Sequence, residues 1–143
     1  MKKFAFPLDR VIEWRRTEAR IEESKLERLH TELRAIDVRR AALEQERRIS
    51  EQATLSAGAI TGYELAALDT FQRFTVAERG RLERARIPFQ DRATKQIEAV
   101  TAKHREVRLL ERLREQRLKA WTIEQDREIE AQAGEAYLAK WHR

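Results

Sequence analysis

The chain has 143 residues, 38% of them charged, and a mean hydropathy of −0.76. These values exclude a thick globular core, and the four glycines and two prolines exclude a division into many short elements. The absence of cysteine excludes disulfides and thiolate metal sites, and no apolar run approaches the ~18 residues of a membrane span. We expect a cytoplasmic protein made of a few long helices.

The first stretch predicts a helix over about residues 8–54. Pro7 suits a first helical turn, where its missing N–H needs no partner, and Asp9 adds favourable negative charge there. Apolar residues then recur at steps of three and four or their sums, which is typical of a coiled-coil seam: Leu8, Ile12, Ala19, Leu26, Leu29, Leu33, Ile36 and Leu43. Polar residues, Arg47 among them, interrupt this seam, and such residues fix register while weakening the packing.

Residues 56–61 form the one convincing connector, because this stretch is uncharged and two of the four glycines lie in it or directly after it. Thr61 and Glu64 have the spacing of a capping box, which predicts a second helix over about residues 62–141. Its apolar stripe comprises Leu65, Leu68, Phe71, Phe74, Leu82, Ala85, Phe89, Ala93, Ile97, Val100 and Val107. At Pro88 we expect a kink or a short interruption, because proline removes a helical hydrogen bond.

The short connector predicts one elongated all-α domain over residues 1–143, a long antiparallel two-helix coiled-coil hairpin. Facing residues should have numbers that sum to roughly 118 or 119. On this count the last ~30 residues of the second helix overhang the first. The overhang carries an apolar stripe of its own, which predicts either an external binding surface or packing against a second copy: Ile129, Ala133, Ala136, Tyr137 and Trp141.

No motif predicts catalysis, a cofactor, a metal ion or a small-molecule substrate. His30, His104 and His142 are far apart in sequence, and the chain lacks a glycine-rich phosphate loop and a nucleophile elbow. Residues 73–119 contain 14 Lys and Arg against 7 Asp and Glu, a charge of +7. A solvated coiled-coil flank explains this charge, and the interleaved acids disfavour nucleic-acid binding, which stays a lesser alternative. We therefore expect a protein that acts by binding other proteins.

The N-terminus resembles that of the flagellar export protein family FliJ. The residues that carry the likeness are Phe4, Phe6, Leu8, Val11, Ile12, Arg15, Arg16 and Glu18. The turn at residues 56–58 and the late helix over residues 113–141 are also similar to that family. This resemblance implies a non-enzymatic stalk of the type III export apparatus, similar to the central stalk of rotary ATPases.

Three partners follow from the resemblance: the hexameric flagellar export ATPase, the cytoplasmic domain of the export gate, and substrate export chaperones. The ring-contact candidates at the paired termini are Phe4, Phe6, Leu8, Tyr137 and Trp141. The gate-contact candidates toward the turn are Leu43, Arg47, Phe71 and Phe74. Family members can carry tyrosines where this chain has Leu43 and Arg47. The implied location is the cytoplasmic face of the inner membrane, reached only through the gate.

Two further interpretations stay open. The equivalent stalk of a virulence-type secretion system shares every feature used above, and the genes next to this one would distinguish the two systems. A homodimeric coiled-coil scaffold unrelated to secretion predicts tight self-association, whereas the stalk predicts a mainly monomeric protein in isolation.

Overall fold

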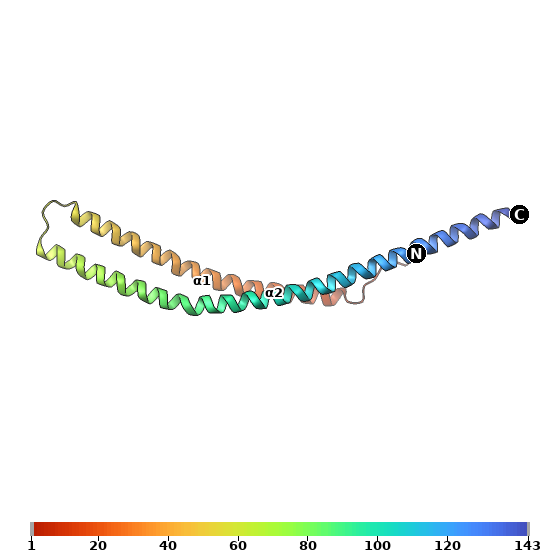
Figure 1. Ribbon diagram of the computed structural model, residues 1–143, viewed down its shortest axis with the longest axis horizontal. Coiled ribbons are helices and arrows are strands. Elements are labelled where there is room, and N and C mark those ends of the chain that lie inside the picture. Colours follow the sequence, from red (N-terminus) through yellow and green to blue (C-terminus); the bar gives the residue numbers. More distant parts are fainter. Residues whose placement is uncertain (1, 143) are drawn as a thin grey trace. The chain divides into compact units, whose positions relative to one another are not determined.

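The computed structural model describes residues 2–142, which form two α-helices joined by a short turn (Figure 1). α1 spans Asp9–Leu55 and α2 spans Gly62–Trp141. Residues 2–142 contain no β-strand. The protein is an all-α antiparallel two-helix coiled-coil hairpin with a C-terminal overhang, as the sequence predicts, and each helix boundary lies within a residue of its expected place.

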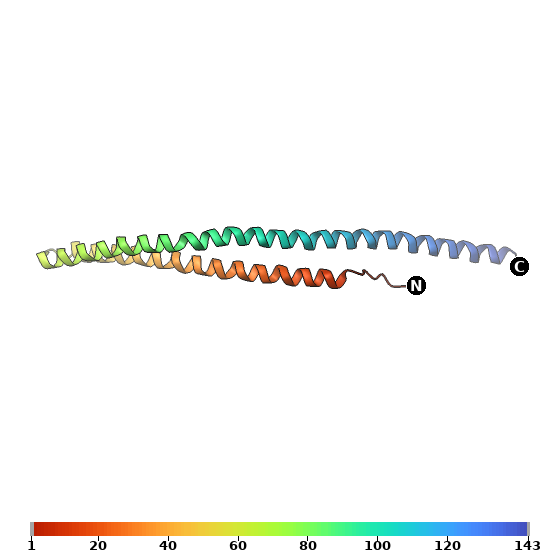
Figure 2. The same cartoon turned by 90° about the horizontal axis from the view of Figure 1, so that it is seen from below.

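Contacts within the chain group it into two compact units. The turn unit is Glu22–Val100, and the terminal unit comprises the residues up to Ile21 together with those from Thr101 onward. In the turn unit the chain reverses after α1, and the beginning of α2 runs back beside the end of α1 (Figures 1 and 2; Figure 2 turns the view by 90°). In the terminal unit the end of α2 continues beyond the start of α1 in both views.

Local chemistry explains the reversal in the turn unit. Gly58 has a φ of 72°, the left-handed conformation that ends many helices and that a residue with a Cβ adopts at a cost. The predicted capping box is present, because the Thr61 N–H donates to Glu64 Oε2 (3.3 Å) and the Glu64 N–H donates to Thr61 Oγ1 (3.2 Å). These bonds fix the start of α2 close behind the end of α1.

The core of the turn unit is a single seam of small and medium aliphatic side chains. Leu43 and Ala93 are each 1% exposed, while Leu33 and Leu82 are each 7% exposed. Leu33 and Leu43 belong to the predicted seam of the first helix, and Leu82 and Ala93 to the predicted stripe of the second. Buried side chains that recur at heptad spacing on both helices therefore hold the two helices together.

Part of the predicted stripe on α2 lies outside this seam. Leu65, Phe74 and Ile97 are about half exposed (51%, 52% and 48%). Thr75, 3% exposed, and the partly buried Gln96 take seam positions instead. The Thr75 hydroxyl donates to the Phe71 carbonyl (2.9 Å) and the Gln96 side chain to the Glu22 carbonyl (2.9 Å), so polar atoms on the seam are hydrogen-bonded.

Of the kink or short interruption expected at Pro88, the interruption is wrong, since α2 is continuous through this residue. The kink stays a prediction. Pro88 lies on the exposed side of the helix, and the seam residues Leu82 and Ala93 are buried on either side of it. One lost backbone hydrogen bond costs less than the packing that these flanking residues would lose if the helix ended here.

In the turn unit the Gln96 side chain reaches the Glu22 carbonyl (2.9 Å), and these two residue numbers sum to 118, as the connector count predicts. A count from the connector predicts residue 78 or 79 opposite Arg40, but Arg40 pairs with Glu83 (3.3 Å), and Asp37 pairs with Arg86 (3.0 Å). An arginine side chain reaches about one helical turn, ~5.4 Å, along the facing helix, so both ion pairs are compatible with the predicted register.

The terminal unit packs the start of α1 against the middle of α2. Ile12 is 3% exposed, Ala19 is 4% exposed and Val107 is 8% exposed. Ion pairs join the two helices along this seam: Arg15 with Glu106 (3.2 Å), Arg16 with Glu111 (2.7 Å), Glu18 with Lys103 (3.4 Å) and Asp9 with Arg114 (2.9 Å). Apolar packing supplies most of the attraction, because exposed ion pairs each contribute ~1 kcal/mol or less.

Candidate functional site

The N-terminal arm, residues 2–8, lies against α2 in the terminal unit. The Phe4 and Trp121 rings are tilted by 55°, with centroids 5.9 Å apart, and the Arg114 guanidinium carbon lies 5.7 Å from the Phe4 centroid. Phe6 is 7% exposed, and the Asp9 N–H donates to the Phe6 carbonyl (3.1 Å). Two of the predicted ring-contact residues, Phe4 and Phe6, are therefore anchored to this protein's own helix.

An open groove of about 650 Å³ remains between the arm and α2. Phe4, Leu113 and Trp121 supply apolar surface, while Lys2 and Lys3 line it with positive charge. Leu8 also lines this groove and is partly buried. Apolar surface edged by charge is suited to a side chain of another protein.

Trp121 and Arg114 were absent from the predicted contact set, although both hold Phe4. The available signal was the position of Trp121, an aromatic residue at the point where the second helix extends past the first. No comparable signal marked Arg114, one of several arginines in a basic stretch.

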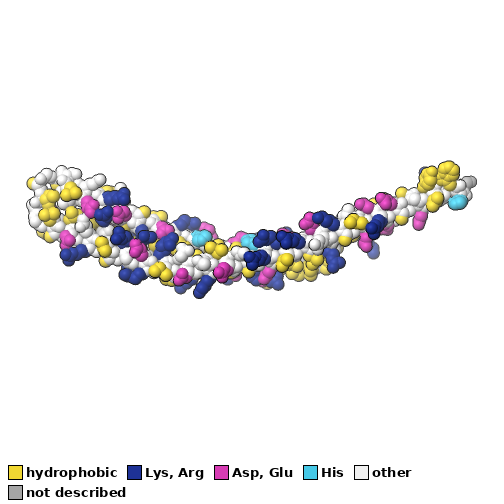
Figure 3. All heavy atoms as spheres, in the orientation of Figure 1, with side chains coloured by type: hydrophobic (Ala, Val, Ile, Leu, Met, Phe, Trp, Pro, Cys, Tyr) yellow, Lys and Arg dark blue, Asp and Glu magenta, His cyan; other side chains and the backbone are white. Residues whose placement is uncertain are grey.

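The far end of α2 exposes a second aromatic group. Tyr137 and Leu138 are each 60% exposed and Trp141 is 75% exposed. The Tyr137 and Trp141 rings lie 6.1 Å apart and are tilted by 53°. Figure 3 shows hydrophobic side chains gathered at the C-terminal end of α2, next to a histidine. Large side chains at this level of exposure are typical of surfaces that bind another protein.

The structure separates the predicted ring-contact set into two groups. Phe4, Phe6 and Leu8 lie beside the part of α2 that contains Leu113 and Trp121. Tyr137 and Trp141 follow farther along α2, and the helical rise places Tyr137 about 24 Å beyond Trp121. No contact joins the two groups among residues 2–142.

The predicted gate-contact residues occupy three different environments in the turn unit. Leu43 is 1% exposed, so its side chain packs between the helices and is not available to another protein. Phe71 is partly buried, whereas Phe74 is 52% exposed. Their rings lie 6.5 Å apart with an interplanar angle of 36°. Phe74 is thus the exposed member of an aromatic pair whose other ring is partly buried.

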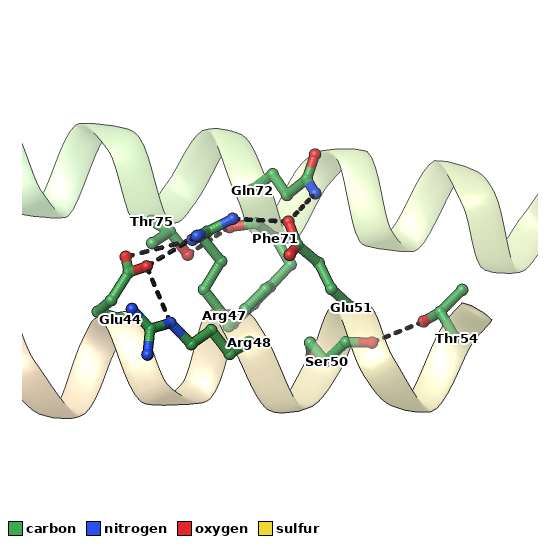
Figure 4. Close-up of polar contacts among 9 residues, drawn as sticks. All are labelled: Glu44, Arg47, Arg48, Ser50, Glu51, Thr54, Phe71, Gln72 and Thr75. Atoms are coloured by element: carbon green, nitrogen blue, oxygen red, sulfur yellow. Dashed lines mark hydrogen bonds and ion pairs between the residues drawn. The ribbon is translucent and has the colours of Figure 1, made fainter. Parts of the chain in front are cut away.

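Arg47 belongs to a polar network between the helices of the turn unit (Figure 4). Its guanidinium pairs with Glu44 (2.7 Å) and with Glu51 (2.7 Å), and Gln72 of α2 donates to Glu51 (2.8 Å). Figure 4 shows the Arg47 side chain directed from α1 toward α2 between the two carboxylates. The network links the helices near the turn and leaves Arg47 with its charge already compensated.

Within this network the pKa of Arg47 is raised and the pKa of Glu44 is lowered. The hydrogen bond with Glu44 is the largest cause of a raised pKa at Arg47. The hydrogen bond from Arg47 is likewise the largest cause of a lowered pKa at Glu44. Both residues therefore stay charged over the whole neutral pH range.

A further exposed apolar surface lies at the turn, and the sequence-based contact set does not include it. Leu55 is 71% exposed, Ile60 is 36% exposed, Tyr63 is 85% exposed and Leu65 is 51% exposed. A signal was present, since residues 52–63 contain no charged side chain. A helical end without charge is unusual in a chain with this composition and indicates a contact surface.

Residues 2–142 include no group of three or more His, Asp or Glu side chains placed to hold a metal ion. Within the same range, neither helix has a segment long and apolar enough to cross a membrane. The chain matches no protein-family model, no curated protein and no solved structure.

Proposed function

We propose that this protein is a non-enzymatic stalk of the flagellar type III export apparatus, which couples the export ATPase to the export gate. The observation that carries the proposal is the C-terminal overhang of α2, where Tyr137, Leu138 and Trp141 are exposed. An aromatic surface at the end of a charged helical hairpin is suited to shallow contacts inside a protein ring. The likeness of the N-terminal residues to the FliJ family supports the same function.

The proposed contacts with the ATPase ring involve the terminal unit. Tyr137 and Trp141 make the primary contact, because they are exposed and far from α1. The groove beside Phe4 and Trp121 accepts a side chain of the ring. Phe6 supports the groove from beneath, since it is buried against the protein itself.

The proposed contacts with the gate and with substrate chaperones involve the turn unit. Phe74 is retained from the predicted set, and Tyr63 and Leu65 join it because they are exposed on the same helix. Leu43 is left out of the contact, and Arg47 acts by holding the two helices in register.

The test is binding to a purified hexameric export ATPase. Replacing Tyr137 and Trp141 together by alanine should weaken binding at least tenfold, because aromatic anchors often contribute ~2 kcal/mol each. Replacing Tyr63 and Leu65 by alanine is the matched control, which removes an exposed apolar pair from the turn unit and should leave ring binding unchanged. Circular dichroism checks that both variants keep their helicity. Equal binding by wild type and the Tyr137/Trp141 variant would contradict the assignment.

A further inference from the structure

One face of α2 carries a heptad-spaced stripe on the side away from α1. Its members follow one another at alternating steps of four and three residues: Arg105, Leu109, Arg112, Gln116, Lys119, Ile123, Asp126, Glu130, Ala133 and Tyr137. Every one of these side chains is exposed. We call this set the outer stripe, and it lies wholly within the terminal unit.

The outer stripe is distinct from the seam that binds α1. Val107 is 8% exposed and packs on the α1 side, and Leu110 and Leu118 are partly buried. Leu109, the neighbour of Leu110 and a member of the stripe, is 65% exposed. Residues at steps of three and four share one helix face, so α2 has two separate heptad faces over residues 105–118, one covered and one open.

Charge divides the outer stripe into two halves. Arg105 and Arg112 lie in the first half, and Asp126 and Glu130 lie in the second. None of these four side chains has an ion pair within residues 2–142, in contrast to Lys119, which pairs with Glu115 (3.2 Å). The stripe therefore has a free basic half followed by a free acidic half on the same helix face.

We propose that the outer stripe binds the outer stripe of a second copy of this chain, with the two α2 helices antiparallel. An antiparallel pair with its two-fold axis at the level of residue 121 sets Arg112 opposite Glu130, Leu109 opposite Ala133 and Arg105 opposite Tyr137. These matches are an ion pair, an apolar contact and a cation–π contact. Two-fold symmetry makes each match occur twice.

The same alignment places Gln116 opposite Asp126 and Lys119 opposite Ile123, so every stripe residue faces a compatible one. A parallel pair would set each arginine against the same arginine of the other copy, and each acid against the same acid, which is unfavourable. The paired stretch, residues 105–137, is about 48 Å long. Polar residues occupy six of its ten positions, so association is reversible and weakens with salt.

Charge exchange tests this pairing by sedimentation equilibrium over a range of protein concentrations. Arg112→Glu and Glu130→Arg should each weaken self-association about tenfold, because each variant places two like-charged pairs in the dimer. An equimolar mixture of the two variants should recover wild-type association, since the carboxylate introduced in one variant then faces the guanidinium introduced in the other. Glu135→Arg is the matched control: it makes the same charge change off the stripe and should leave association unchanged.

Cysteine pairing tests the antiparallel order, and the absence of cysteine from the natural chain removes any background. Leu109→Cys mixed with Ala133→Cys should form a disulfide between the two variants, while neither variant alone should form one efficiently. A disulfide formed by Ala133→Cys alone would overturn the antiparallel order. A wild-type protein that stays monomeric at all concentrations, or an Arg112→Glu variant that associates as well as wild type, would overturn the proposal. The proposed association is reversible, so it agrees with a stalk that is mainly monomeric when dilute, whereas tight association would favour the homodimeric scaffold. Binding to the export ATPase is measured separately, so failure of one proposal can be distinguished from failure of the other.

Discussion

Leu43 shows how much one side chain contributes to a seam only two helices wide. It is 1% exposed, so Leu43→Ala removes a fully buried side chain from the turn unit. We expect the free energy of unfolding, measured by urea denaturation, to fall by about 2–4 kcal/mol. Val38→Ala is the control, because Val38 is 68% exposed and should change stability by less than ~0.5 kcal/mol. A similar loss in both variants would contradict the burial of Leu43.

Phe4 and Trp121 form the aromatic contact that holds the N-terminal arm on α2. A double-mutant cycle of Phe4→Ala and Trp121→Ala should give a coupling energy of about 0.5–1.5 kcal/mol in thermal or urea unfolding. Trp14, 64% exposed, supplies the control cycle with Phe4 and should give a coupling near zero. Strict additivity of the Phe4 and Trp121 changes would mean that the two rings do not stabilise one another.

The burial of single residues was predictable at positions where a heptad seam requires a covered side chain. Ile12 and Leu43 follow from periodicity, since the seam positions of a heptad must be covered. Phe74 could not be placed in the same way, because it stands one residue before Thr75 and either could have faced α1. Thr75 takes the seam with its hydroxyl bonded to its own helix, a solution that hydrophobicity alone does not predict.

At the scale of the elements, the turn depends on one glycine. Gly58 has a φ of 72°, so Gly58→Ala should destabilise the protein by about 1 kcal/mol even though no atom lies within 4 Å of the added methyl group. Gly62→Ala is the matched control: its added methyl group also meets open space, but its backbone does not have a positive φ. That variant should be neutral or slightly stabilising, because alanine favours helix. Equal melting temperatures for the two variants would contradict the role of Gly58.

The extent of both helices was predictable because strong local signals mark their ends. Asp9 follows Pro7 at the start of α1, and the capping box of Thr61 and Glu64 opens α2, so the boundaries do not depend on distant contacts. The continuity of α2 through its proline was not predictable in the same way. It depends on packing summed over many turns, which no short stretch of sequence contains.

For the whole molecule, the dependence of folding stability on pH follows from glutamates whose charged form is stabilised by nearby arginines. Three glutamates have a pKa lowered below 4.5, chiefly by a hydrogen bond from a nearby arginine: Glu27 with Arg34, Glu44 with Arg47, and Glu78 with Arg81. A lowered pKa in the folded state means that the unfolded chain binds more protons in acid. The stability from these groups is therefore complete above pH 4.5 and is lost as pH falls through the lower folded pKa values.

Melting temperatures measured from pH 7 to pH 2 should accordingly stay level down to about pH 5 and then decrease. Glu44→Gln should make the decrease shallower, because it removes one of the carboxylates that must be protonated. Glu46→Gln is a control for a carboxylate whose ion pair, with Arg39, is a longer 3.5 Å contact. A melting temperature that rises on acidification would contradict the sign of this effect.

Function was less accessible from the sequence than the fold. Periodicity and caps decide where helices form, whereas partner contacts depend on which apolar residues are left uncovered after the seam has formed. Tyr137 and Trp141 could be proposed in advance because the first helix runs out before them. The exposed Tyr63 could not, since nothing in the sequence distinguishes it from a residue that packs inside the turn. The outer stripe required both the register and the absence of ion pairs, within residues 2–142, at four of its charged residues.

The overhang of α2 should also change the rate at which backbone amides exchange hydrogen for deuterium. Residues from about 122 to 141 form helix without help from α1, and an isolated helix of ~20 residues is only marginally stable in water. Their amides should exchange much faster than those near Val107, where the helix packs against α1. Whatever protein covers the overhang should slow this exchange residue by residue, so an exchange profile locates the bound surface before any complex is crystallised. Uniform protection along α2 in the isolated monomer would contradict this expectation.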